Sequence, residues 1–272
     1  MFVINETKKE MLNSLVESGK NCLITGPTGT GKTTLWLEVA EELGMNPVVI
    51  NMGSTQDARS SLLGFFTLDE GSTEFQQADF LKAIQEDNTL IILDELSRAS
   101  DDAYNIVFPI LDFRRNLRVD EMEEGEREVQ VNPQTRFIAT ANIGLEYSST
   151  RAIDRAIQDR FRIFNLDYIT GKELGKYITQ TEGGEVSKMI KPLLKIYDYS
   201  HKMFRDGKIA TRISTRAILE SCCLLSNFKI KDVLDHNILS IFEQDSNSIA
   251  SDSNILREYA DSLGIYSESE NA

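Results

Sequence analysis

A glycine-rich stretch at residues 26–34 has the composition of a phosphate-binding loop (P-loop). It reads Gly-Pro-Thr-Gly-Thr-Gly-Lys-Thr-Thr, follows the apolar run 22–24 and leads into the helical pattern 35–43. Glycines let the backbone turn tightly and aim N–H groups at phosphate oxygens, and the helix start adds a positive dipole end. Lys32 can reach the β- and γ-phosphates, and the Thr33 hydroxyl can bind Mg²⁺. An ordinary glycine-rich turn would show this Gly-Lys-Thr spacing only by coincidence.

The motif therefore predicts a nucleoside triphosphate site. Its expected binding residues are Gly26, Pro27, Thr28, Gly29, Thr30, Gly31, Lys32, Thr33 and Thr34.

Two carboxylates, Asp94 and Glu95, follow the continuous apolar run 89–93. Such a run is typical of a strand buried on both faces of a parallel sheet. A carboxylate at the end of that strand lies beside the crevice in which α/β sheets bind ligands. Asp94 is then placed to hold Mg²⁺ together with Thr33, and Glu95 to act as the general base for hydrolysis. Without the P-loop, a solvated Asp-Glu pair would be the simpler interpretation.

The remaining hydrophobic patterns alternate between strands and helices. Further strands are expected at residues 47–51, 136–141 and 162–166, with helical patterns at 79–85 and 102–113. This alternation predicts an α/β fold with a doubly wound parallel sheet. Later patterns are all helical, at residues 173–181, 186–204, 215–228, 230–244 and 255–263. We therefore expect a nucleotide-binding core over residues 1–169 and a small all-helical domain with a polar C-terminal tail over residues 170–272.

Composition limits the class of protein. The net charge of −14 argues against a broad basic face that grips nucleic acid. No apolar run is long enough to span a bilayer, and the N-terminus lacks the basic and apolar regions of a signal peptide. The three cysteines form neither a disulfide framework nor a metal-ligand spacing. We therefore expect a cytoplasmic protein without a membrane contact.

The order of the motifs resembles that of AAA+ ATPases. The P-loop, the Leu-Asp-Glu strand, the strand ending at Asn142 and the later Asp159-Arg160-Phe161 follow that family's order. Within the family, the chain is similar to the MoxR-like branch, which includes the small ATPase subunit of cobalt chelatase. The segments that carry this likeness are residues 63–64, 80–84, 94–99, 150–161 and 213–218. Ser97 and Thr215 depart from the family pattern, but the arginines of their segments are present.

The resemblance implies roles for three further side chains. Asn142 would orient the lytic water or contact the γ-phosphate, as the family's first sensor does. Arg160 matches the arginine finger that reaches a neighbouring subunit's nucleotide. Arg155 is the poorer candidate for that role, and an ion pair within the domain is the structural alternative for Arg160. Arg216 matches the second sensor on a helical lid, with Arg212 as its alternative.

The same resemblance implies an activity and partners. The chain is expected to be an ATPase that converts ATP and water to ADP and phosphate with Mg²⁺. It is also expected to form a homo-oligomer, by resemblance a hexameric ring, that remodels or activates a protein partner. In relatives this partner is often a protein with a von Willebrand A domain. A nucleic-acid motor or loader is the alternative, against which the acidic balance weighs, and a small-molecule kinase fits the motif order poorly.

Three surface features have competing interpretations. Arg98 fits either a contact between subunits or a surface salt bridge. The acidic run 120–126 precedes the alternating residues 127–131 and predicts a hairpin with a charged, solvated tip. By resemblance, the alternative for this hairpin is a contact with the pore of the ring or with the partner. Residues 64–68 fit a second inserted hairpin. Phe65 or Phe66 would then contact a substrate if exposed, but core packing is the simpler expectation.

Overall fold

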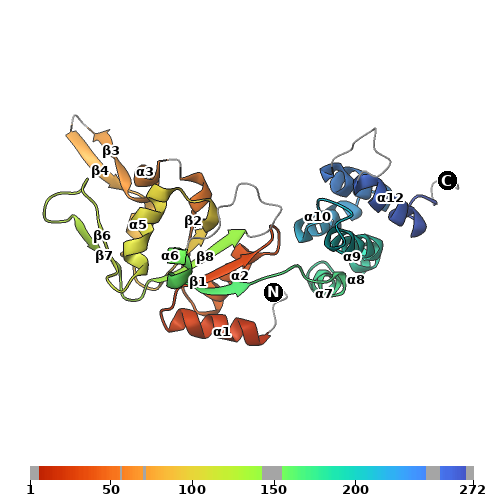
Figure 1. The fold of residues 1–272 in the computed structure, drawn as a ribbon, viewed down its shortest axis with the longest axis horizontal. Coiled ribbons are helices and arrows are strands. Elements are labelled where there is room, and N and C mark those ends of the chain that lie inside the picture. Colours follow the sequence, from red (N-terminus) through yellow and green to blue (C-terminus); the bar gives the residue numbers. More distant parts are fainter. Residues whose placement is uncertain (1–5, 56, 70–71, 143–154, 243–251, 268–272) are drawn as a thin grey trace. The chain divides into compact units, whose positions relative to one another are not determined.

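The computed structural model describes residues 6–55, 57–69, 72–142, 155–242 and 252–267. The chain divides into two compact units (Figure 1). The α/β unit ends at Leu166 and the helical unit begins at Asp167, with residues 28–30 grouped with the helical unit. Each unit has its own hydrophobic core.

A parallel sheet of five strands forms the centre of the α/β unit (Figure 1). In spatial order the strands are β2 (Asn46–Asn51), β5 (Thr89–Asp94), β8 (Arg136–Asn142), β1 (Cys22–Gly26) and β9 (Arg162–Asn165). Every neighbouring pair is parallel, so the carboxyl ends of all five strands share one edge. The strand that comes first in the chain lies between β8 and β9. This topology confirms the doubly wound α/β class.

Alternate strand residues pack against helices on opposite faces of the sheet. In β5, Leu90 and Ile92 share a core with α1 (Glu6–Glu17) and α2 (Lys32–Glu42). Ile91 and Leu93 share the other core with α3 (Ala58–Leu62), α4 (Asp79–Ala83) and α5 (Asp101–Leu111). All four side chains are fully buried, as expected of a parallel strand covered on both faces.

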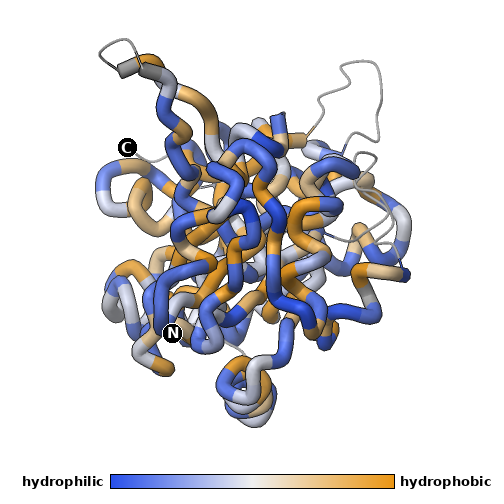
Figure 2. The backbone as a smooth tube through the Cα atoms, turned by 90° about the vertical axis from the view of Figure 1, so that its left-hand side faces the viewer, coloured by the Kyte–Doolittle hydropathy of each residue, from blue (hydrophilic) through white to orange (hydrophobic). Residues whose placement is uncertain are grey.

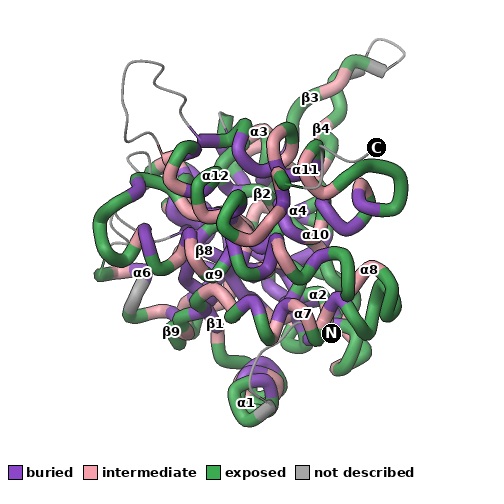
Figure 3. The backbone as a smooth tube through the Cα atoms, turned by 90° about the vertical axis from the view of Figure 1, so that its right-hand side faces the viewer, coloured by how far each residue is buried: buried purple, intermediate pink, exposed green. Residues whose placement is uncertain are grey.

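Two hairpins belong to this unit. β6 (Asn116–Arg118) pairs with β7 (Glu128–Gln130), which confirms the hairpin with an acidic tip. β3 (Gly64–Asp69) pairs with β4 (Ser72–Gln77). The expected core packing of Phe65 and Phe66 is wrong, because these residues are 52% and 55% exposed and Leu68 is 81% exposed. An isolated two-stranded hairpin leaves its apolar residues uncovered. Part of the β3–β4 hairpin is hydrophobic (orange in Figure 2), and its strands are largely exposed (green in Figure 3).

The second unit is all-helical in the part of the chain that the structure describes. Its helices are α7 (Gly171–Thr181), α8 (Gly184–Met189), α9 (Lys191–Arg205), α10 (Thr215–Leu225), α11 (Ile230–Val233) and α12 (Asp252–Ser262). Their apolar faces form a core that includes Leu174, Ile196 and Ile218. α7 begins with a capping box, in which Thr170 and Glu173 each accept a hydrogen bond from the other's N–H.

The observed helices differ from the expected ones in their bounds and in their number. The helix expected over residues 186–204 is two helices, α8 and α9, because Pro192 has no N–H for the preceding turn and fits the first turn of a new helix. The helix expected over residues 230–244 gives way after α11 to a π turn and a 3₁₀ turn. α1 was not predicted, although its Leu12 and Val16, one turn apart, are fully buried.

The backbone at the end of β1 lies very close to the segment that follows β9. Gly26 has a φ of 152°, and a Cβ built on it would lie 2.0 Å from the Leu166 carbonyl oxygen. We expect Gly26→Ala to lower the free energy of unfolding by more than about 1 kcal/mol, because alanine is strained at this φ and the backbone must shift. Gly125→Ala is the matched control, since a Cβ there meets nothing within 4 Å. Urea unfolding measures both variants, and equal midpoints would contradict the close approach.

Candidate active site

The predicted site residues meet at the carboxyl edge of the sheet. Gly26 of β1 pairs with Asn142 of β8, and β5, which pairs with the other side of β8, ends at Asp94. The P-loop leaves from this edge and enters α2 at Lys32. Open α/β sheets bind ligands at the carboxyl edge, at the point where the order of the strands reverses direction.

The P-loop backbone adopts conformations that favour glycine. φ is 152° at Gly26, 78° at Gly29 and 81° at Gly31. The Gly31 carbonyl accepts the first helical hydrogen bond, from the N–H of Leu35 at 2.9 Å. The opening N–H groups of a helix have no acceptor within it, so the start of α2 is suited to an anion. Thr34 is exposed in this first turn.

The Lys32 ammonium group is buried beside the P-loop. Its Nζ donates hydrogen bonds to the carbonyl oxygens of Gly26, at 3.0 Å, and Pro27, at 2.7 Å. Burial lowers the pKa of Lys32 to about 8, while the charges of Asp94 and Glu95 act in the opposite direction. A desolvated cation in this position is stabilised by an incoming anion, so Lys32 is placed to bind phosphate.

Asp94 connects α2 to the neighbouring strand. Its Oδ1 accepts hydrogen bonds from the hydroxyls of Thr33, at 2.8 Å, and Thr140, at 2.6 Å. The Thr140 hydroxyl accepts one from the N–H of Glu95, at 3.0 Å. Hydroxyl and carboxylate oxygens are the hard ligands that Mg²⁺ prefers, so Thr33 and Asp94 fit this ion. Sequence reasoning missed Thr140, although it lies two residues before Asn142 and therefore on the same strand face.

Glu95 follows β5 with a left-handed backbone, at φ 54° and ψ 40°. This conformation is uncommon outside glycine, and such residues cluster at functional sites, where their surroundings hold them. The Glu95 Oε2 pairs with Nη1 of Arg98 at 3.1 Å. Of the two interpretations of Arg98, the structure therefore contains the salt bridge. The side chain of Glu95 is 31% exposed, so water can reach its carboxylate.

Asn142 ends β8 and is buried, beside the first residue of the P-loop. Its position agrees with the expected placement at the strand edge. Residues 150–154 of the motif that leads to Arg160 lie outside the described residues.

Arg160, at the end of α6 (Arg155–Arg160), makes an ion pair within the α/β unit. Its Nε lies 2.9 Å from Oδ1 of Asp112, and its Nη2 donates to Oδ2 at 3.2 Å. Its Nη1 donates to the carbonyl of Ala156 at 2.7 Å, and the guanidinium lies 4.7 Å from the Phe108 ring centre. This is the structural alternative that the sequence left open. Arg155 is exposed at the other end of α6, and the finger role of either arginine stays a prediction.

The two lid arginines also differ in their surroundings. The Arg212 guanidinium lies 4.4 Å from the ring centre of Tyr168 and 4.6 Å from that of Phe204. Arg216 is exposed in the first turn of α10. The packing of Arg212 against two rings favours a structural role for it. Arg216 therefore remains the better candidate for the second sensor.

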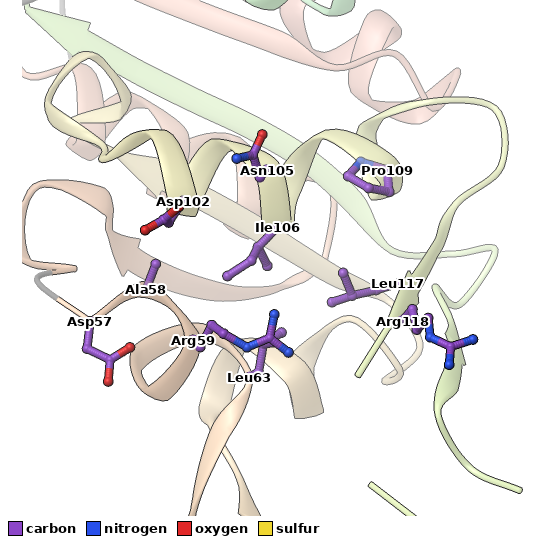
Figure 4. A pocket seen from close by; sticks show the side chains of 10 residues that line it. All are labelled: Asp57, Ala58, Arg59, Leu63, Asp102, Asn105, Ile106, Pro109, Leu117 and Arg118. Atoms are coloured by element: carbon purple, nitrogen blue, oxygen red, sulfur yellow. The ribbon is translucent and has the colours of Figure 1, made fainter. Parts of the chain in front are cut away.

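A cavity of about 650 Å³ lies in the α/β unit between α3, α5 and β6 (Figure 4). It is lined by Asp57, Ala58, Arg59, Leu63, Asp102, Asn105, Ile106, Pro109, Leu117 and Arg118. Arg59 forms a bidentate pair with Glu121, with both distances 2.7 Å, and Arg118 pairs with Asp120 at 2.8 Å. The lining contains no residue of the predicted nucleotide site, so this cavity is separate from it.

The chain is similar to bacterial proteins. The chain is 31% identical over 247 residues to an uncharacterized protein of Staphylococcus saprophyticus, a match that covers 89% of this chain and 91% of the relative. It is 29% identical over 249 residues to an uncharacterized protein of Staphylococcus aureus strain USA300, covering 89% and 90%. A solved structure from Cytophaga hutchinsonii superposes with a TM-score of 0.48 at 16% identity, covering 79% of this chain and 72% of that one.

Within the described residues, no helix combines the length and apolarity that crossing a bilayer requires. The family model for the AAA domain (dynein-related subfamily) matches residues 21–161, from the residue before β1 to the residue after Arg160. This span holds the P-loop, Asp94, Glu95 and Asn142, and it is just over half of the chain. The chain therefore belongs to the AAA domain family, in its dynein-related subfamily.

Proposed function

We propose that this protein is a MoxR-like AAA+ ATPase that forms a hexameric ring and uses ATP hydrolysis to remodel or activate a protein partner. The observation that carries the ATP hydrolysis in this proposal is the hydrogen-bonded set Thr33, Asp94, Thr140 and Glu95 beside the buried Lys32, whereas the ring and the partner rest on the resemblance. One strand edge thereby combines a fixed cation, an oxygen pair suited to Mg²⁺ and a carboxylate base. These are the parts that phosphoryl transfer to water requires.

Each of these residues has its own task in the proposed mechanism. Lys32 and the N–H groups at the start of α2 bind the phosphates of ATP, while Thr33 and Asp94 hold Mg²⁺. Bound Mg²⁺ supplies charge neutralisation on the phosphate oxygens. Glu95 accepts a proton from the attacking water at its carboxylate, and Asn142 orients that water through its side-chain amide.

Assembly would complete the site. We propose that residues 1–169 act as the nucleotide-binding core and residues 170–272 as a lid whose Arg216 contacts the γ-phosphate. Arg160 would act as the finger in the site of a neighbouring copy, exchanging Asp112 for phosphate, with Arg155 as the alternative. A contact of this head-to-tail kind is heterologous and closes into a ring only at the right rotation.

The partner is proposed from resemblance alone. A protein with a von Willebrand A domain is the partner class that the MoxR-like branch suggests. The cytoplasm is the proposed compartment. Stimulation of ATP hydrolysis by DNA is the measurement that would favour the alternative, a nucleic-acid motor or loader.

The pKa of Lys32 predicts how nucleotide affinity depends on pH. With a pKa lowered to about 8, Lys32 is charged at about pH 7 and mostly neutral at about pH 9. Phosphate binding requires the charged form, so binding above about pH 8 must take up a proton. We expect the affinity for a fluorescent ATP analogue with Mg²⁺ to be constant near pH 7 and to weaken above about pH 8, by up to about tenfold per pH unit.

Lys32→Arg is the matched control for this titration, because a guanidinium stays charged over the whole range. Its affinity should therefore change little with pH. A flat wild-type profile from about pH 7 to pH 9.5 would show that burial does not set the charge of Lys32.

The role of Glu95 is tested by separating binding from hydrolysis. Glu95→Gln removes the base but leaves Lys32, Thr33 and Asp94 in place. We expect nucleotide binding to be retained and phosphate release to slow by about 10²–10⁴. Glu124→Gln, in the acidic hairpin tip, is the control and should hydrolyse ATP at the wild-type rate. Wild-type hydrolysis by Glu95→Gln would transfer the base role to another carboxylate.

A finger acting in trans predicts recovery of activity on mixing. Arg160→Ala and Glu95→Gln proteins, each nearly inactive alone, should release phosphate when mixed. In a mixed ring, some interfaces pair the intact Glu95 of one copy with the intact Arg160 of the next. Phosphate release is measured while one variant is titrated into the other, after subunit exchange has been confirmed. No recovery at any ratio would count against Arg160 acting in trans.

Arg155→Ala is the matched variant at the other end of α6. Recovery with Arg155→Ala but not with Arg160→Ala would assign the finger to Arg155. Because Arg160 also holds Asp112 and the Ala156 carbonyl, we expect Arg160→Ala to lower the free energy of unfolding by about 1 kcal/mol. Unfolding midpoints therefore separate loss of the fold from loss of the finger.

A further inference from the structure

The surface beside Arg160 is rich in cations. A cavity of about 280 Å³ opens there, lined by residues from the loop before β1, the start of β9, the ends of α5 and α6 and the segment after α5. The charged side chains that line it are Lys20, Arg115, Arg160 and Arg162 against Asp112 and Asp159. Four cations thus face two carboxylates, in a chain whose net charge is −14. The cavity therefore differs in sign from the chain as a whole.

Phe113 lines the same cavity and is 94% exposed, the largest exposure among the large hydrophobic residues described. A turn surrounds it, closed by a hydrogen bond of 3.3 Å from the N–H of Arg115 to the carbonyl of Asp112, and the side chains at both ends of the turn are held. Asp112 holds Arg160, and Arg115 donates from Nη2 to the carbonyls of Asn132, at 3.1 Å, and Thr135, at 2.8 Å. Phe113 is therefore presented to solvent by an ordered turn.

An ordered, exposed aromatic ring beside arginines has the composition of an interface hot spot. Aromatic residues and arginine dominate the binding energy of protein interfaces. A ring whose backbone is already fixed loses little conformational entropy on binding. A larger part of the free energy of burying the ring therefore contributes to affinity. While it stays exposed to water, the ring contributes no hydrophobic stabilisation to the single chain.

We propose that Phe113 is the aromatic anchor of the contact between two copies of this chain. It packs against the neighbouring copy next to the nucleotide that Arg160 reaches. The occupant follows from charge, because a second copy is acidic overall and carries an anionic nucleotide, which complements the cation-rich cavity. The inference rests on the proposed function, since the ring and the trans role of Arg160 define this face.

The test measures assembly of the full chain by sedimentation velocity over a range of concentrations, with Mg²⁺ and a non-hydrolysable ATP analogue. We expect Phe113→Ser to raise the concentration of half-assembly by about tenfold or more. A change of this size corresponds to the free energy of burying one aromatic side chain. Arg162→Glu should also weaken assembly and flatten its dependence on salt. Phe65→Ser, which removes another exposed phenylalanine from the β3–β4 hairpin, is the matched control and should assemble like the wild type.

The outcomes separate this inference from the proposed function. If the wild type assembles and Phe113→Ser assembles equally well, the anchor is overturned and the ring stands. If the wild type stays monomeric at every concentration, the ring and the anchor both fail. If Phe113→Ser and Arg162→Glu assemble normally but lose binding to a fluorescein-labelled DNA duplex of about 20 base pairs, the face binds nucleic acid and the inference is overturned. Thermal midpoints from circular dichroism confirm that each variant is folded.

Discussion

The carboxylate of Asp94 is the group on which the architecture of the site depends. It accepts hydrogen bonds from Thr33 in the first turn of α2 and from Thr140 in β8. Both reach it because β5 lies beside β8 and β8 lies beside the strand that leads into α2. The Trp36 indole N–H donates to the Ala139 carbonyl of β8 at 3.0 Å and fixes α2 over β8. The site is therefore a property of strand order as much as of the P-loop.

Local patterns were sufficient to predict the strands, the P-loop and the carboxylate pair, because their signals lie within a few residues. The contacts that refine the site are not local. Arg160 and Asp112 are 48 residues apart in the chain, and Thr140 and Asp94 are 46 apart. Such pairs leave no periodic trace in the sequence. Exposure of Phe65 escaped prediction for another reason, since an apolar residue indicates burial only where a further layer covers it.

Arg160 has two prospective partners, and the chemistry of its ion pair permits an exchange between them. The side chains of Arg160 and Asp112 are 25% and 24% exposed, so water still screens the pair and limits its net stabilisation. A triphosphate offers more negative charge to the same planar, bidentate donor. Asp112 therefore orders the guanidinium in a single copy without excluding a stronger anion from a neighbour.

α5 contacts both the turn after β5, which holds the proposed base, and the face that carries Arg160. Near its start, the Tyr104 hydroxyl donates to the carbonyl of Leu96, the residue after the proposed base. Just beyond its end, Asp112 holds Arg160 and Phe113 extends into solvent. Between these points the helix is buried along one face, through Ala103, Ile106, Val107, Ile110 and Leu111. The two ends of one packed helix therefore contact the residue after the proposed base and the residue that holds Arg160. If Phe113 forms the proposed contact between copies, α5 is the element that would connect that contact to the site.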